Sequence, residues 1–464
     1  MSEKTELELM KEQLFYNQKN GYDRLPKEEI SELENYCSRY ISFMNLAKTE
    51  RECVSESVKL AEAAGFVPFV PSMELKPGTK IYRNNRGKAL TLAVIGKKSA
   101  AEGVNIVASH IDSPRIDLKP NPLYEDSEMA FFKTHYYGGI KKYQWPTVPL
   151  ELRGVVALKD GSVVDVCFGA DKNEPVLVIT DLLIHLAGDQ MKKSLAEGIA
   201  GEALNVLLGS KPLEGEGSDR VKLAVMSILN KKYGIVEEDF LSAELTLVPA
   251  FEARAVGLDG SFIGAYGHDD RVCAYAALEG LLAVGVPEKT AVVTLADKEE
   301  IGSMGVSGME SKEFDTFIED ICDAQGVNVG HCFRNSACLS CDVSNAYDPN
   351  YPEVSDRRNN AKVNYGINIC KYTGSRGKSG SSDASAEFMA KVRKILDDGN
   401  VVWQTGELGK VDQGGGGTVA MIMANKNIDT VDVGVPVLSM HAPWEVVAKL
   451  DAYMNYKAAK VFFE

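Results

Sequence analysis

Residues 290–303 have the sequence Thr290-Ala-Val-Val-Thr-Leu-Ala-Asp297-Lys-Glu299-Glu300-Ile-Gly-Ser303. The apolar run in this stretch predicts a buried strand, and the acidic residues follow that strand directly. Active sites in open α/β sheets lie just beyond the carboxyl ends of the parallel strands. Two neighbouring glutamates at such a place can divide the work, with one binding a metal ion and the other carrying a proton. A run of solvated charges is the alternative interpretation.

The surrounding chain shows a regular alternation of expected strands and helices, as at 290–296 and 431–435. Such alternation predicts an α/β fold with a mostly parallel sheet that is covered by helices. Residues 118–250 have a different pattern, in which pairs of strands lie among helices. We therefore expect one catalytic domain formed by residues 1–117 and 251–464, interrupted by an inserted second domain at 118–250.

The composition narrows the classes of function. The chain has 464 residues, with 51 Lys and Arg against 66 Asp and Glu, and a net charge of −15. This acidic balance argues against binding to nucleic acid or to anionic membranes, because both attract positive charge. No run approaches ~18 consecutive apolar residues, the length of a membrane-spanning helix. The odd number of cysteines, nine, and the charged residues 1–8 predict a cytoplasmic protein with reduced thiols and no secretory signal.

A second strand end carries a His-x-Asp motif. The apolar stretch 104–109 is followed by His110, Ile111 and Asp112. Because side chains alternate along a strand, His110 and Asp112 lie on one face, and the carboxylate can orient the imidazole or support a metal ion. A hydrogen bond at the end of a strand is the alternative explanation for this pair.

Further junctions between strands and helices carry the same kinds of side chain, at Asp269–Asp270, Asp342 and His441. Taken one by one, they have ordinary explanations as helix caps, solvated charges or a core histidine. Taken together with His110 and Glu300, and with one carboxylate from the Asp269–Asp270 pair, they supply two imidazoles and three carboxylates. Such a set can hold two divalent ions if one carboxylate bridges them.

The order of these motifs closely resembles the aspartyl aminopeptidase family of dinuclear metallopeptidases. The motifs are Ser109-His-Ile-Asp-Ser-Pro114, Asp269-Asp270, Asp297-Lys-Glu-Glu-Ile-Gly-Ser303, Ser340-Cys-Asp342 and Met440-His441. The similarity extends over residues 63–441. It implies an aminopeptidase that removes the N-terminal residue from peptides with two divalent ions, namely zinc, with manganese or cobalt as alternatives.

The resemblance also implies the role of each residue. The implied metal ligands are His110, Asp269, Glu300, Asp342 and His441. Asp269 is the implied bridge, while Asp270 stands where relatives often have Asn. His441 and Glu300 then complete one metal site, and His110 and Asp342 complete the other. Glu299 is the implied general base, and Asp112 supports His110.

Three further positions are candidates for binding substrate. Lys371 matches a family position that contacts substrate, and a plain surface lysine is the alternative. His185 matches a family histidine that could reach a neighbouring active site, and an ordinary helix histidine is the alternative. Asn345 begins the segment 345–351, where many relatives have two histidines that this chain lacks. The less cationic pocket leads us to expect a preference for neutral or apolar N-terminal residues over strictly acidic ones.

The resemblance has implications for assembly as well. In the family, the inserted domain pairs subunits, and the dimers assemble into a tetrahedral dodecamer, so we expect the same homo-oligomer here. Two other functions remain as alternatives: a metal-dependent amidohydrolase or deacylase of small acyl-amino acids, and a catalytically inactive assembly protein. The intact pair Glu299–Glu300 argues against the inactive protein.

Overall fold

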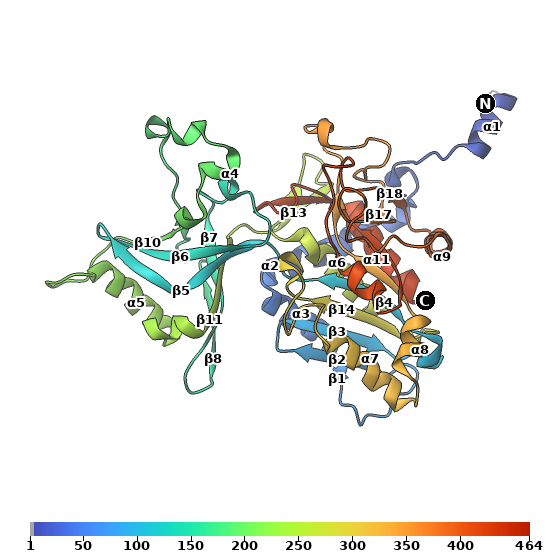
Figure 1. Ribbon diagram of the computed structural model, residues 1–464, viewed down its shortest axis with the longest axis horizontal. Helices are drawn as coiled ribbons and strands as arrows, with labels where there is room; N and C mark the ends of the chain where they lie inside the picture. The colour runs from blue at the N-terminus through green and yellow to red at the C-terminus, as the bar shows by residue number, and fades with distance from the viewer. Residues whose placement is uncertain (1–3) are drawn as a thin grey trace.

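The computed structural model describes residues 4–464, and its strands form three sheets. The sheets contain nine, seven and five strands within this part of the chain. The first three residues of the stretch 1–8, from which we expect no secretory signal, lie outside the described residues. Figure 1 shows the seven-stranded sheet on the left and the nine-stranded sheet, with most of the helices, on the right.

The nine-stranded sheet carries the predicted α/β fold. Its central strands, in the order β14-β4-β15-β19, run parallel to one another. The neighbouring pairs β2–β3, β3–β14 and β17–β19 are antiparallel. A short turn joins β2 to β3, and such a connection reverses the chain direction. The strands are β1 Val67–Pro68, β2 Lys80–Asn85, β3 Ala89–Val94, β14 Ala291–Ala296, β4 Asn105–His110, β15 Ala337–Cys341, β19 Asp429–Gly434, β17 Ile367–Cys370 and β18 Trp403–Thr405.

Helices cover both faces of this sheet, as predicted. In β14, Val293 packs into the core on one face and Val292 into the core on the other, as expected for a strand buried on both sides. The first core includes α2 Ile30–Leu46, α3 Glu50–Ala63, α6 His268–Ala283, α9 Ala386–Asp398 and α11 Lys449–Phe463. The second core includes α7 Glu313–Ala324, α8 Val329–Arg334 and α10 Val419–Ala424. The α/β fold class is therefore confirmed.

The seven-stranded sheet is antiparallel and has a core of its own, around Trp145 and Phe132. Its first strand begins at Arg115, so the domain boundary expected after residue 117 falls inside that strand. Helix α5 packs against this sheet. The elements are β5 Arg115–Asp126, β6 Met129–Tyr137, β7 Leu150–Ala157, β8 Val163–Phe168, β9 Val178–Ile179, α4 Leu195–Gly198, β10 Val206–Gly209, α5 Arg220–Tyr233 and β11 Ala243–Pro249.

The five-stranded sheet joins strands from residues 254–265, 344–345 and 436–448. Its strand β13 leads into α6, and its strand β21 leads into α11, which packs against α6. The strands, in spatial order, are β12 Arg254–Val256, β13 Phe262–Ala265, β21 Glu445–Ala448, β20 Pro436–Leu438 and β16 Ser344–Asn345.

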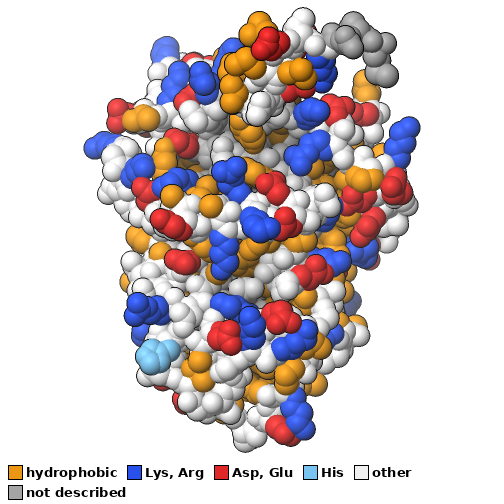
Figure 2. Space-filling view, turned by 90° about the vertical axis from the view of Figure 1, so that its right-hand side faces the viewer, with side chains coloured by type: hydrophobic (Ala, Val, Ile, Leu, Met, Phe, Trp, Pro, Cys, Tyr) orange, Lys and Arg blue, Asp and Glu red, His pale blue; other side chains and the backbone are white. Residues whose placement is uncertain are grey.

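The surface carries charges of both signs. Figure 2 shows acidic and basic side chains interspersed over one face of the molecule. Exposed ion pairs of the described chain include Lys394 with Asp398 and Lys97 with Glu288. The N-terminal helix α1 Glu6–Leu14 buries none of its residues. None of the helices within residues 4–464 is both long enough and apolar enough to cross a membrane.

Candidate active site

Three neighbouring parallel strands bring the first group of side chains together. The strands lie in the order β14-β4-β15, and His110 is the last residue of β4. Asp342 directly follows β15, while Glu299 and Glu300 lie in a short 3-10 helix, Glu299–Ile301, just after β14. Because parallel strands end at the same edge of a sheet, these four side chains meet there.

Asp269 and His441 reach this edge from two other segments, and one buried carboxylate fixes both. Asp269 lies at the start of α6, and His441 lies in the loop between β20 and β21. Glu445, the first residue of β21, is only 1% exposed. Its Oε2 accepts a hydrogen bond from the backbone N–H of Asp269 (3.0 Å), and its Oε1 accepts one from the N–H of His441 (2.7 Å). Glu445 thus ties together two segments that are far apart in sequence.

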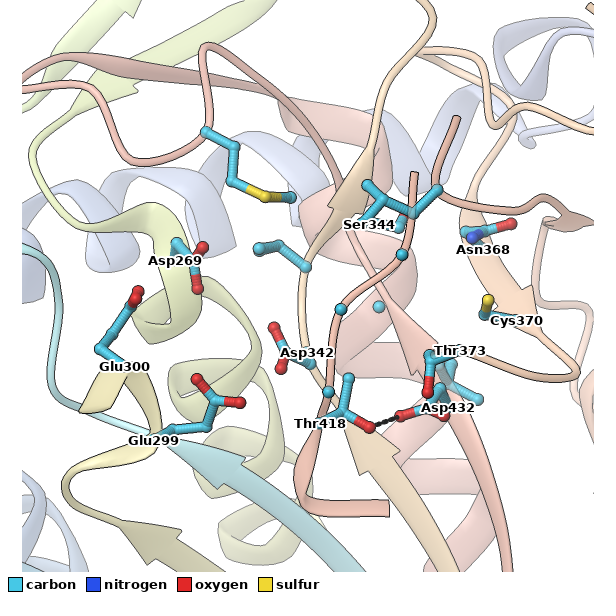
Figure 3. A pocket seen from close by; sticks show the side chains of 18 of the residues that line it. Asp269, Glu299, Glu300, Asp342, Ser344, Asn368, Cys370, Thr373, Thr418 and Asp432 are labelled. Atoms are coloured by element: carbon cyan, nitrogen blue, oxygen red, sulfur yellow. Dashed lines mark hydrogen bonds between the residues drawn. The ribbon is translucent and has the colours of Figure 1, made fainter. Parts of the chain in front are cut away.

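Asp269 lies between the two histidines. Its Oδ1 is 3.2 Å from Nε2 of His110, and its Oδ2 is 3.1 Å from Nε2 of His441. His110, Asp269 and Asp342 form one group of potential metal ligands, and Asp269, Glu300 and His441 form a second. Within each group the ligand atoms lie within 4.8 Å of one another. Figure 3 shows the carboxylates of Asp269, Glu300 and Asp342 around a common space.

The hydrogen bonds of His110 and His441 show which nitrogen of each imidazole carries the proton. The other nitrogen of each ring faces Asp269. Nδ1 of His110 lies 3.0 Å from the carbonyl oxygen of Asp112, and Nδ1 of His441 lies 2.8 Å from the carbonyl oxygen of Gly139. A carbonyl oxygen only accepts, so both Nδ1 atoms carry the proton and donate. In the neutral imidazoles both Nε2 lone pairs then face carboxylate oxygens of Asp269, and this contact becomes favourable when a proton or a metal ion lies between the two atoms. The donor set therefore fits metal ions.

Burial of several carboxylates in one place creates the same demand for positive charge. Burial raises the pKa of Glu300 to about 9, and the nearby Asp269 raises it as well. Burial also raises the pKa of Asp342 and of Glu299. Oε1 of Glu300 is buried and has no hydrogen-bond partner among residues 4–464. Divalent cations stabilise such carboxylates in their ionised form.

A cavity of about 460 Å³ lies beside these carboxylates. Figure 3 shows Asn368, Cys370 and Thr373 on the opposite side, with Thr418 donating a hydrogen bond to Asp432 Oδ1 (2.7 Å). No lysine or arginine of the described chain lines this cavity. Most of the remaining lining is apolar side chain or glycine backbone, from Val343, Leu408, Gly415, Gly416, Gly417, Val433, Gly434 and Met440.

The three candidates for binding substrate do not line this cavity in the single chain. The amine of Lys371 forms an ion pair with Asp383 instead. Asn345 lies in β16. His185 is exposed in a short 3-10 helix, Ile184–Leu186, which belongs to the part of the chain that carries the seven-stranded sheet.

Several residues around the site are not among those predicted from the sequence. Asp432 lies within the apolar strand β19, and a carboxylate inside a buried strand is a signal that could have identified it. Glu445 follows a candidate ligand by four residues, which is a weaker signal. Tyr137 and Gly139 have no such signal, because they contact the site from a remote part of the chain.

Known proteins are similar to this chain along almost its entire length. The family model described as "Aminopeptidase I zinc metalloprotease (M18)" matches residues 43–463. A protein of Clostridium acetobutylicum, "Probable M18 family aminopeptidase 1", is 49% identical over 462 residues, which cover 98% of this chain and 99% of the relative.

Two solved structures have the same fold. The crystal structure of an M18-family aminopeptidase from Thermotoga maritima matches with a TM-score of 0.93 and 43% identity, and covers 97% of this chain and 100% of that one. The crystal structure of aminopeptidase I from Clostridium acetobutylicum matches with a TM-score of 0.92 and 47% identity, with the same coverage of 97% and 100%.

Proposed function

Because this chain belongs to the M18 family of zinc aminopeptidases, we propose that it removes the N-terminal residue of peptides with two divalent ions bound in each chain. The activity class, a metal-dependent aminopeptidase, follows from the family. The number of ions is supported by one observation above all. Asp269 presents one carboxylate oxygen to each of two histidine nitrogens, at 3.2 and 3.1 Å, and a carboxylate that bridges two cations has this arrangement.

The proposed ligands divide between two sites that share Asp269. His110 and Asp342 complete the first site, while Glu300 and His441 complete the second. Imidazole and carboxylate ligands in this proportion suit zinc, and manganese or cobalt accept the same donors. We favour zinc, because the matching family model describes a zinc metalloprotease.

Glu299 is the proposed general base. When bound, the ions supply Lewis acidity that polarises the scissile carbonyl and lowers the pKa of the attacking water. The carboxylate of Glu299 lines the cavity without belonging to either ligand group, so it would accept a proton from that water and then deliver it to the departing amine. Asp112 fixes the backbone that carries Glu299, since its carboxylate accepts hydrogen bonds from the N–H groups of Glu299 (3.1 Å) and Glu300 (3.2 Å).

The cavity favours neutral or apolar N-terminal side chains over acidic ones. An anionic side chain that leaves water needs a cation or several donors in its pocket. The described part of the chain offers no lysine or arginine in the lining. Asp432 adds a buried carboxylate to the lining of the cavity, and its ionised form repels a substrate carboxylate.

We therefore expect kcat/KM for leucyl and methionyl p-nitroanilides to equal or exceed that for aspartyl p-nitroanilide. The Lys371→Met variant serves as a control, and it should change neither value, because its amine is paired with Asp383 outside the cavity. A preference for aspartate over leucine of more than about tenfold, ~1.4 kcal/mol, would contradict this expectation.

The same panel tests the proposed function against its alternatives when it also contains acetylated amino acids, with and without added zinc. An aminopeptidase cleaves the substrates with a free α-amine and depends on the metal. Cleavage of the acetylated compounds alone would favour a deacylase. A chain that binds zinc and cleaves nothing would be an inactive assembly protein.

We further propose that residues 118–250 form a domain that pairs subunits, with residues 1–117 and 251–464 as the catalytic domain, and that the dimers build a tetrahedral dodecamer. Six apolar side chains close together in this domain are 46% to 72% exposed: Leu182, Leu183, Ile184, Leu186, Met191 and Leu195. Exposed apolar side chains gathered in one stretch of the chain support an interface between subunits. His185 lies within this stretch, so pairing would bring it to a neighbouring chain.

A cytoplasmic location is supported by the thiols. All nine cysteines of the chain are free in the structure of residues 4–464. Unpaired cysteines persist in reducing compartments, whereas oxidising compartments favour disulfides.

A further inference from the structure

The end of strand β6 and the two glycines after it lie against the candidate metal centre, although they belong to the part of the chain that carries the seven-stranded sheet. We call these residues the 137–139 segment. Each of its residues contacts a different side chain of the site. The segment is therefore a physical connection between the antiparallel sheet and the catalytic residues.

Tyr137 completes the hydrogen bonding of Asp112. The hydroxyl of Tyr137 donates to Asp112 Oδ2 (2.9 Å), which also accepts from the backbone of Glu300. The other oxygen of Asp112 faces Nδ1 of His110 (3.2 Å) and accepts from the backbone of Glu299. Asp112 is 1% exposed, so water cannot replace a lost donor at no cost. The Tyr137 hydroxyl thus helps to hold the group that orients three catalytic residues.

The ring of Tyr137 is itself held in place. The guanidinium of Arg115 lies 3.9 Å from the centre of the ring. Arg115 is in turn paired with Glu50 (3.1 Å) and Asp117 (2.8 Å). This arrangement restricts the position of the hydroxyl, because the ring lies against a guanidinium that two carboxylates fix.

Gly139 orients His441. Its carbonyl oxygen accepts the proton of His441 Nδ1 (2.8 Å), which directs the Nε2 lone pair towards Asp269 and Glu300. The side chain of His441 is 32% exposed, so packing alone does not fix the ring. The partner of the second nitrogen commonly decides the orientation of a metal-binding histidine.

Gly138 leaves room for Glu300. A Cβ atom at residue 138 would lie 3.2 Å from Oε2 and 3.3 Å from Cβ of Glu300. The backbone of Gly138 also has φ +74°, a conformation that favours glycine. Any side chain at this position would therefore press on a candidate metal ligand.

We propose that the 137–139 segment is a positioning element of the metal centre. It orients His441 through the carbonyl oxygen of Gly139 and leaves room for Glu300 at Gly138. It also supports the backbone of Glu299 and Glu300 through Asp112. The proposal rests on the proposed dinuclear function. The part of the chain that carries the seven-stranded sheet therefore has a second role besides its proposed role in assembly. It determines the affinity of the metal site formed by Glu300 and His441.

The first test is Gly138→Ala, with Gly161→Ala as the matched control. Gly161 lies between β7 and β8 with φ +88°, and a Cβ there would meet nothing within 4 Å, so it reproduces the backbone strain without the contact. Zinc affinity of the metal-free proteins is measured by competition with a chromophoric chelator. We expect Gly138→Ala to bind one of the two ions about ten- to a hundredfold more weakly, and Gly161→Ala to bind both as the wild type does.

The second test is Tyr137→Phe, with Tyr136→Phe as the control. Tyr136 is the neighbouring residue, is 40% exposed, and points to the opposite face of the strand. We expect Tyr137→Phe to lower kcat about tenfold, to leave KM for leucyl p-nitroanilide unchanged, and to alter the visible spectrum of the cobalt-substituted protein. Tyr136→Phe should match the wild type in all three measurements.

The proposal would be overturned if Gly138→Ala bound both zinc ions with wild-type affinity and Tyr137→Phe kept the wild-type kcat and cobalt spectrum. Equal weakening of both ions by Gly138→Ala, or a metal-free melting temperature well below that of Gly161→Ala, would also overturn it, because either result indicates a general structural role. A wild-type chain that binds fewer than two zinc ions would instead contradict the proposed function, and the two failures are thus distinguishable.

Discussion

The Glu299→Gln variant is expected to lose about a hundredfold to ten-thousandfold in kcat while it retains both zinc ions. An amide has nearly the same shape as the carboxylate but cannot accept the proton of the attacking water. Glu299 is not one of the proposed ligands, and its Oε2 lies 3.9 Å from Nε2 of His110. The measurement combines steady-state kinetics on leucyl p-nitroanilide with metal analysis of the same preparation.

Glu310→Gln is a suitable control for this substitution. Glu310 is an exposed glutamate eleven residues further along the chain, outside the cavity lining. The Glu310→Gln variant has the same change of charge as Glu299→Gln and should retain wild-type activity. If Glu299→Gln also keeps activity within a few-fold of the wild type, Glu299 is not the general base.

Asp269→Ala is expected to lose both metal ions, and with them nearly all activity. The proposed bridge contributes a ligand to each site, and its Oδ1 and Oδ2 face different histidines. His110→Ala and Asp342→Ala should each weaken mainly one ion, because these residues belong to one group only. Zinc equivalents bound per chain, measured after dialysis, distinguish these patterns.

Asp270→Asn is the matched control, since it alters the adjacent buried carboxylate. Asp270 belongs to neither group of potential metal ligands among the described residues, so this variant should retain both ions. If Asp269→Ala bound two full equivalents of zinc and Asp270→Asn lost zinc, the bridging ligand would be Asp270 and not Asp269.

The parts of this site that sequence reasoning identifies share one physical property. His110, Asp342 and the pair Glu299–Glu300 each follow an apolar run that forms a buried strand, so the polar residue is marked by its immediate neighbours. Parallel strands then place such residues at one edge of the sheet. The α/β fold follows from the same alternation of strands and helices, and the structure confirms it.

Other features of the site and of the fold depend on contacts between residues far apart in the sequence, which no local sequence pattern predicts. Gly139 reaches His441 across 302 positions of sequence, and Tyr137 reaches Asp112 from the end of a strand in another sheet. The ion pair that holds Lys371 away from the cavity depends on how the loop with Asp383 folds. The boundary expected after residue 117 falls inside β5, because one long strand passes from the active-site edge into the seven-stranded sheet.

The central claim, a dinuclear centre in which both ions serve catalysis, is tested most directly by titrating the metal-free chain with zinc while heat of binding and hydrolysis of leucyl p-nitroanilide are followed together. The metal-free chain should remain folded, since its large apolar cores lie in the sheets and helices and do not depend on the ligands. We predict that two equivalents bind per chain and that activity reaches its maximum only after the second. Saturation of both binding and activity at one equivalent would contradict the account.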